Sequence, residues 1–112
     1  MRAGRLDKRV SLERIDPGED DHGEPLETWS TLAVRWASIE PLNGREYLAK
    51  SVENSEVTTR IRLRYDSVSS TLTSADRINH NGTIYSIDGP PINPRMQNAE
   101  LVLMCVLNDR LN

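Results

Sequence analysis

The sequence predicts a mainly β fold, a small antiparallel β-barrel of about five to six strands with one short helix and long loops. Three observations support this prediction. Apolar and polar residues alternate along several short stretches, an Asn-Gly pair separates two of them, and only one segment has the features of a helix. The 112 residues fit one domain that spans residues 1–112.

The first expected strand covers residues 8–15, where Val10 and Leu12 alternate with charged and polar residues. Prolines and glycines then predict a mobile loop over residues 16–27, a segment with six acidic residues and no Lys or Arg. Residues 1–14 carry five basic and two acidic side chains, a local charge of +3. This separation of charge favours contacts between unlike surfaces of neighbouring molecules.

Two further strands are apolar on both faces, over residues 26–39 and 101–107. A strand in a small barrel turns one face inward, so an apolar outer face has to be covered by a helix or by another chain. Because the chain has only two Trp, three Tyr and no Phe, Trp36 in the first of these strands is the better candidate for an interface anchor. Trp29 is expected in the core, or as a staple beneath the acidic loop.

The clearest strand signal is the alternation from Val57 to Tyr65, with one core face and one basic face that carries Arg60, Arg62 and Arg64. Three interpretations of the arginines remain open: a solvated face with partners on neighbouring strands, a subunit contact, and a track for nucleic-acid phosphates. The last is the weakest, because no aromatic residues interleave with the arginines to stack on bases.

Asn81-Gly82 predicts a two-residue hairpin turn between strands at residues 77–80 and 83–87. The one expected helix spans about residues 44–54. Asn43 and Glu46 have the spacing of a capping box, and Glu46 and Lys50 form an i,i+4 pair. Its apolar stripe is narrow, so it needs a surface to pack against.

The sequence offers little for catalysis, and we expect no enzyme, no cofactor and no small-molecule substrate. It has no phosphate-binding glycine loop, no metalloprotease motif and no paired cysteines. His22 in the acidic loop is a candidate metal ligand, but a solvated turn is the simpler interpretation, and Asp76 and Glu100 have no pattern that pairs them. The lone Cys105 is expected to be a buried hydrophobic residue in a reducing compartment, and no stretch is long enough for a membrane span.

The order of motifs resembles the tailed-phage head-tail adaptor, or head-tail joining, family. The resemblance rests on Met1 to Val10, Gly23-Glu24-Pro25 with Trp29, and Trp36 to Glu46, followed by the basic strand, the hairpin and the last strand. It covers nearly the whole chain and departs from the family pattern at the Pro-rich stretch from Gly89 to Arg95.

The resemblance implies a virion protein that forms a ring below the portal, helps to retain packaged double-stranded DNA and provides the surface for tail attachment. Its partners would be further copies of itself and the portal, adaptor and tail proteins, and it would reside in the host cytoplasm before assembly. The connection over residues 41–55 would line or close the channel. The expected interface or channel residues are Trp36, Arg45, Glu46, Lys50, Arg60, Arg62 and Arg64.

We expect the isolated protein to be monomeric or weakly associated, and to assemble only on a portal complex. Two alternatives remain: a single-stranded nucleic-acid-binding module of the OB type, for which the arginine strand is the argument, and a tail or baseplate component of the same particle.

Overall fold

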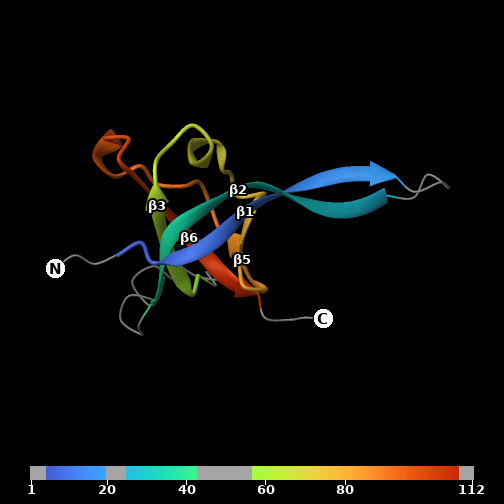
Figure 1. Cartoon of the computed structure of the whole chain (residues 1–112), viewed down its shortest axis with the longest axis horizontal. Coiled ribbons are helices and arrows are strands. Elements are labelled where there is room, and N and C mark those ends of the chain that lie inside the picture. Colours follow the sequence, from blue (N-terminus) through green and yellow to red (C-terminus); the bar gives the residue numbers. More distant parts are fainter. Residues whose placement is uncertain (1–4, 20–24, 43–56, 109–112) are drawn as a thin grey trace.

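The computed structural model describes residues 5–19, 25–42 and 57–108. In these ranges six strands form one closed antiparallel barrel in the spatial order β1-β2-β3-β6-β5-β4 (Figure 1). Their bounds are β1 Lys8–Glu19, β2 Pro25–Pro41, β3 Thr59–Arg64, β4 Arg77–His80, β5 Thr83–Ile87 and β6 Glu100–Asn108. Two short 3-10 turns, η1 Ser69–Thr71 and η2 Pro94–Met96, interrupt the connections. The mainly β barrel is confirmed, whereas the helix expected at residues 44–54 lies outside the described residues.

The barrel interior is filled by aliphatic side chains, as a composition poor in aromatics predicts. The fully buried members include Leu12, Ile61, Leu63, Ile78 and Leu103, each with no exposed surface. They come from four strands and pack in one cluster, with two tyrosines, Tyr65 and Tyr85, only partly buried at its margin. The inward positions of β3 are Thr59, Ile61 and Leu63, so the predicted division of this strand into a core face and an arginine face is confirmed.

The hairpin of β4 and β5 has the predicted bounds and turn. Asn81 and Gly82 both have positive φ, 53° and 92°, as a type I′ turn requires. The side chain of Asn79 supports the turn, because its Oδ1 accepts a hydrogen bond from the Gly82 N–H at 2.8 Å.

The prediction of an acidic loop over residues 16–27 is wrong at both of its ends. Residues 14–19 of β1 and 25–30 of β2 pair in six consecutive positions, from Arg14↔Ser30 to Glu19↔Pro25, and we call this two-stranded segment the arm. The prolines that indicated a loop are tolerated because each arm strand has one edge without a neighbouring strand among the described residues, where a missing N–H breaks no ladder. His22 and the remaining tip residues lie outside the described residues.

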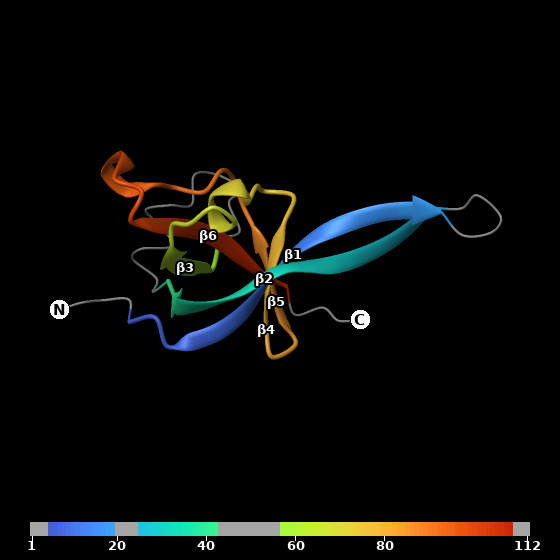
Figure 2. The ribbon, with the colours of Figure 1, turned by 45° about the horizontal axis from the view of Figure 1, so that its top comes forward.

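The arm projects well beyond the barrel, and the described chain measures 53 × 32 × 25 Å (Figures 1 and 2). The pairing of β1 with β4 ends at Glu13↔Arg77, so the six arm pairs extend about 20 Å past the barrel at the usual rise per residue. A register shift between Leu12 and Glu13, which leaves Leu32 of β2 unpaired, falls at this point. Such a bulge bends and twists a strand pair, which directs the arm away from the barrel.

The Pro-rich stretch after β5 pairs with one edge of β6. Ile92 and Val102 exchange two backbone hydrogen bonds of 2.8 Å. This stretch therefore pairs with the same edge of β6 as β5 does, beyond the last β5–β6 pair, Ile87↔Cys105. Val102 faces outward, yet it is only 8% exposed between Ile92 and Arg62 on its two sides. Part of the apolar outer face of β6 is therefore covered by a non-helical stretch of the chain itself, where we expected a helix or another chain.

The connection between β3 and β4 is held by Asp66. Its Oδ1 accepts hydrogen bonds from the N–H groups of Val68 and Ser69, and its Oδ2 accepts one from Arg35 Nε at 2.8 Å. Burial alone would raise the pKa of Asp66, but the N–H groups and the Arg35 guanidinium outweigh it, so the pKa is lowered.

Candidate subunit interface

Four of the seven candidate residues lie on one outer surface of the barrel, which we call the arginine face. Trp36 is on β2, and Arg60, Arg62 and Arg64 are on β3. The ladder between these strands ends at Ala37↔Leu63, so Trp36 and Arg64 are the next opposed positions. The other three candidates, Arg45, Glu46 and Lys50, lie outside the described residues.

Two of the arginines belong to a chain of ion pairs that crosses three strands. Glu40 of β2 accepts from Arg60 Nε at 3.2 Å, and its second oxygen lies 3.7 Å from Arg62 Nε. Arg62 Nη1 then donates to Glu100 of β6 at 3.3 Å. The interpretation of a face with cross-strand partners thus holds for Arg60 and Arg62. Arg64 is exposed and forms no ion pair with another residue that the structure describes.

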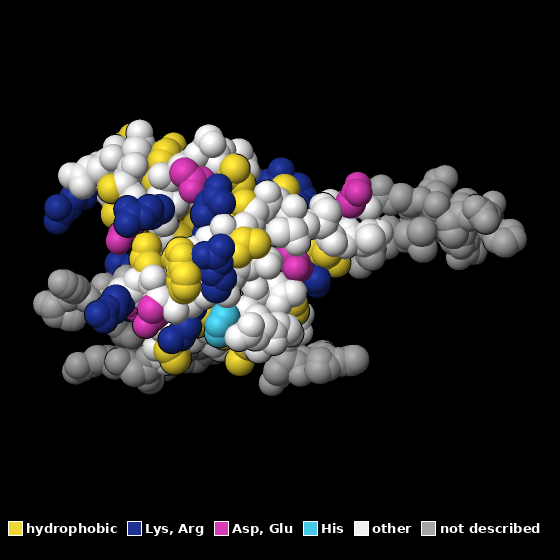
Figure 3. Space-filling model, viewed as in Figure 1, with side chains coloured by type: hydrophobic (Ala, Val, Ile, Leu, Met, Phe, Trp, Pro, Cys, Tyr) yellow, Lys and Arg dark blue, Asp and Glu magenta, His cyan; other side chains and the backbone are white. Residues whose placement is uncertain are grey.

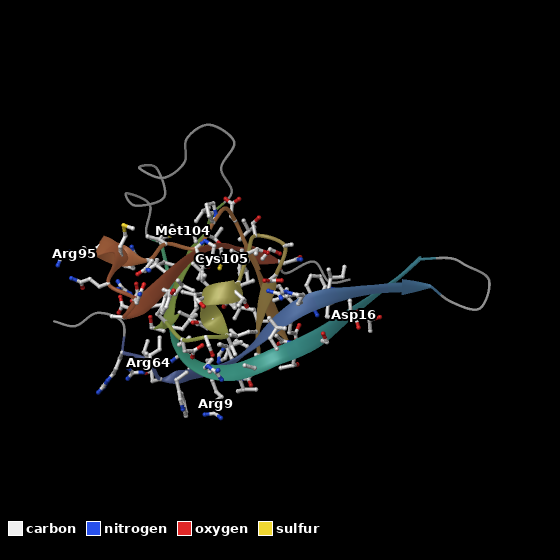
Figure 4. All side chains as sticks on the ribbon, turned by 90° about the horizontal axis from the view of Figure 1, so that it is seen from above. Arg9, Asp16, Arg64, Arg95, Met104 and Cys105 are labelled. Carbon is white, nitrogen blue, oxygen red and sulfur yellow. The ribbon has the colours of Figure 1, made fainter. Side chains whose placement is uncertain are left out.

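An exposed apolar patch adjoins the arginines. Trp36 is 51% exposed, and Val34, two positions along β2, is 40% exposed. The Arg9 guanidinium lies 4.9 Å from the centre of the Trp36 ring, a cation-π geometry. Figure 3 shows Lys and Arg side chains around a hydrophobic cluster on this side of the barrel, and Figure 4 shows Arg9 and Arg64 pointing to the same side. The apolar outer face predicted for β2 is confirmed, and no described part of the chain buries it.

The base of the arm is fixed by charged side chains that the sequence reasoning left without a role. The Asp76 carboxylate, whose side chain is 1% exposed, accepts from Arg14 Nε and Nη2 at 3.0 Å each and from the Thr73 N–H at 2.9 Å. The bonds to Asp76 raise the pKa of Arg14. Glu13, also buried, accepts from Arg77 Nε at 2.6 Å and from Asn79 Nδ2 at 3.1 Å.

Trp29 completes this group, which we call the arm root: Glu13, Arg14, Trp29, Asp76 and Arg77. The Arg77 guanidinium lies 4.1 Å from the centre of the Trp29 ring, so Trp29 acts as a staple at the base of the arm. The hydrogen-bonded partners are 62 positions apart for Arg14 and Asp76 and 64 positions apart for Glu13 and Arg77, and no pattern in the sequence linked them.

Neither a metal-ligand cluster nor an exposed thiol is found among the described residues. No group of three or more His, Cys, Asp or Glu in these ranges could hold a metal ion. Burial raises the pKa of Cys105 to about 12, which leaves the thiol protonated and inert. Among the helices described, none has the length and apolar character to cross a membrane.

Comparison with known proteins places these features in a family. A family described as phage head completion protein matches residues 1–108. The head completion protein gp7 of Enterobacteria phage HK97 is 28% identical over 97 residues, which cover 82% of this chain and 84% of that protein.

Two solved structures share the fold. Protein SF1141 from Shigella flexneri 2a superposes with a TM-score of 0.80 at 26% identity, over 99% of this chain and 100% of that one. A chain from the virion of a native gene transfer agent particle gives a TM-score of 0.62 at 18% identity, over 90% of this chain and 93% of that one. With the match over nearly its whole length, the chain belongs to the phage head completion protein family.

Proposed function

We propose that the chain is a structural virion protein of a tailed phage or prophage, which assembles as a ring at the head-tail connector below the portal. In that position it helps to retain packaged DNA and provides the surface to which the tail attaches. Two similar proteins support a role as a structural virion protein. One is the head completion protein gp7 of phage HK97, and the other is a chain of a gene transfer agent virion that shares the fold. The barrel itself acts as a scaffold and performs no reaction.

The observation that carries the proposal is the exposed patch of Trp36 and Val34 beside the arginines. A folded chain that leaves a tryptophan half exposed next to a second apolar residue gains by burying both against a partner. Neighbouring copies in a closed ring supply such cover with one repeated contact between two different surfaces. We further propose that the isolated chain is monomeric or weakly associated and that the portal complex is the template for assembly.

Residues 41–55 are the segment we propose for the channel, with Arg45, Glu46 and Lys50 as the residues that contact neighbouring subunits or DNA. A phage or prophage that encodes Arg45→Glu together with Lys50→Glu should package its genome and then lose it from filled heads. Normal yields of infectious particles from this variant would remove the proposed role of the segment in closure.

The ring is tested separately by mixing the purified protein with portal complexes and measuring the co-sedimenting mass. Trp36→Ser should abolish the added mass while leaving the fold intact, because a half-exposed side chain contributes little to the isolated barrel. Leu107→Ser is the matched control, since Leu107 is also partly exposed, at 39%, but lies at the far end of β6. Equal binding by the two variants would contradict the assignment of the patch to assembly.

The alternative of a single-stranded nucleic-acid-binding module gains no support from the arginine face. Arg60 and Arg62 are already paired with carboxylates, which leaves Arg64 as the exposed arginine of the strand. A phosphate track would require breaking these pairs. The tail or baseplate alternative is disfavoured by the relationship to a head completion protein.

A further inference from the structure

The arm is an element without a partner in its own chain. It is two strands wide over six residue pairs, and such a hairpin is marginally stable at best in water unless another surface covers it. The contacts that hold it lie at its root, and Asp16, two residues beyond Arg14, is already exposed. By sequence the two strands of the arm carry three acidic residues, Asp16, Glu19 and Glu27, and their one basic residue, Arg14, is already paired with Asp76. A fitting partner surface is therefore a positively charged hollow.

The opposite end of the molecule carries a groove with these properties. The groove has a volume of about 380 Å³ and is lined by Leu6, Arg64, Pro94, Gln97, Ala99 and Glu100. Its cationic member is Arg64, which forms no ion pair within the described ranges, whereas the Glu100 carboxylate is bonded to Arg62. Leu6, Pro94 and Ala99 supply the apolar part.

The turn η2 forms one wall of the groove in an unusual conformation. Arg95, Met96 and Asn98 all have positive φ, between 53° and 56°, which is rare for residues that carry a side chain. Two bonds between Asn93 and Asn98 hold the turn, at 2.7 and 3.0 Å. The result is an exposed Arg95 and a Met96 that is 84% exposed, next to the groove-lining Pro94 and Gln97.

The positions of the two surfaces suit a repeated contact between copies. In Figure 4 Asp16 lies near the base of the arm, which extends toward one end of the long axis, and Arg64 and Arg95 lie toward the other end. An element at one end and its receptor at the other produce a head-to-tail contact, the kind from which closed rings are built.

From these observations we infer that the acidic arm of one copy docks into the Arg64 groove of the next copy. The inference rests on the proposed ring and names the surfaces that join its subunits. Arg64 and Arg95 attract the acidic residues of the arm, and Leu6, Pro94 and Met96 form the apolar part of the docking surface. Docking also supplies the cover that a two-stranded ribbon needs.

Cysteine cross-linking in assembled particles tests the contact. We would introduce Asp16→Cys on the arm and Gln97→Cys in the groove and treat particles with a bismaleimide that has a flexible spacer, because a disulfide tolerates only about 7 Å between Cα atoms. The native Cys105 is fully buried and does not compete. The double variant should give a ladder of linked multimers, whereas each single variant should stay monomeric.

The matched control replaces Gln97→Cys by Thr83→Cys, an exposed position at the β4–β5 turn away from the groove. Glutaraldehyde treatment of the same particles reports whether any ring exists. A glutaraldehyde ladder without a bismaleimide ladder, or an equal ladder from the Thr83 control, overturns the docking contact and leaves the ring intact. Absence of both ladders overturns the ring and the contact together. Cross-links from the arm to a different virion protein would assign the arm to that partner and overturn the inference.

Discussion

The pair formed by Arg14 and Asp76 provides the most direct test of how the arm is held. Asp76→Asn keeps the shape of the side chain but removes its charge and replaces one acceptor oxygen by an NH2 group that can only donate. The amide then faces N–H donors, because the native carboxylate accepts two bonds from Arg14 and one from the Thr73 backbone. The substitution therefore loses a bidentate ion pair and leaves a buried polar group poorly matched.

The size of the effect follows from the burial of the two partners. Hydrogen bonds to charged groups contribute about 1.5 to 3 kcal/mol each, and breaking a fully buried pair costs about 3 to 5 kcal/mol. The Arg14 side chain is 39% exposed and regains water when released, so the loss is reduced to about 2 kcal/mol. For a domain of this size, that lowers the melting temperature by about 8 °C.

The assay is thermal unfolding followed by circular dichroism, with hydrogen exchange of the arm amides as a local readout. Asp7→Asn is the matched control, because Asp7 pairs with Lys8 at 3.5 Å with both side chains about half exposed, a pair worth little. The amides of Ile15, Asp16 and Gly18 should exchange faster in Asp76→Asn, while those of β3 should change only with global stability. Equal melting temperatures for the two variants would show that the arm root is not held by this pair.

Two further predictions concern the turns of the barrel. Gly82→Ala should destabilise the protein by about 1 kcal/mol through backbone strain alone, because Gly82 has a φ of 92° and open space around it. Gly82→Asn should cost less, since Asn tolerates positive φ better than Ala does. Equal urea midpoints for the two variants would contradict this reasoning. Asp66 has a lowered pKa in the folded protein, so its ionisation adds stability that is present above its ordinary value of 3.8 and lost as the pH falls toward the folded pKa. Stability measured by urea unfolding should therefore fall less steeply below about pH 4 in Asp66→Asn than in the native chain, and parallel curves would refute the assignment.

Local patterns predicted the barrel strands because each strand is defined by its own alternation. The β4–β5 hairpin was predicted to the residue, since an Asn-Gly pair fixes both the turn and the register. The core face and the arginine face of β3 were likewise predicted from the alternation of Ile61 and Leu63 with the arginines. These features depend on neighbours within a few residues, which a sequence displays directly.

The arm and its root were missed because they depend on distant partners. Pro17 and Gly18 locally favour a loop, and only the pairing with residues 26 and 27 makes them part of a strand. Asp76 had no sequence signal that linked it to Arg14. For the candidate interface, the alternation of residues placed the three arginines on the outside correctly, but it did not reveal that Glu40 and Glu100 pair with Arg60 and Arg62.

The short ladder between β1 and β4 has a consequence for how the protein folds. It has three pairs, Ser11↔Asn79, Leu12↔Ile78 and Glu13↔Arg77, fewer than any other ladder around the barrel. Its partners are far apart in sequence, 64 positions for Glu13 and Arg77, so its closure costs more loop entropy than that of any other ladder, and we expect it to form late. Since β1 and β2 both continue outward into the arm, a pull on the arm would load this three-pair seam on one side and the β2–β3 ladder on the other.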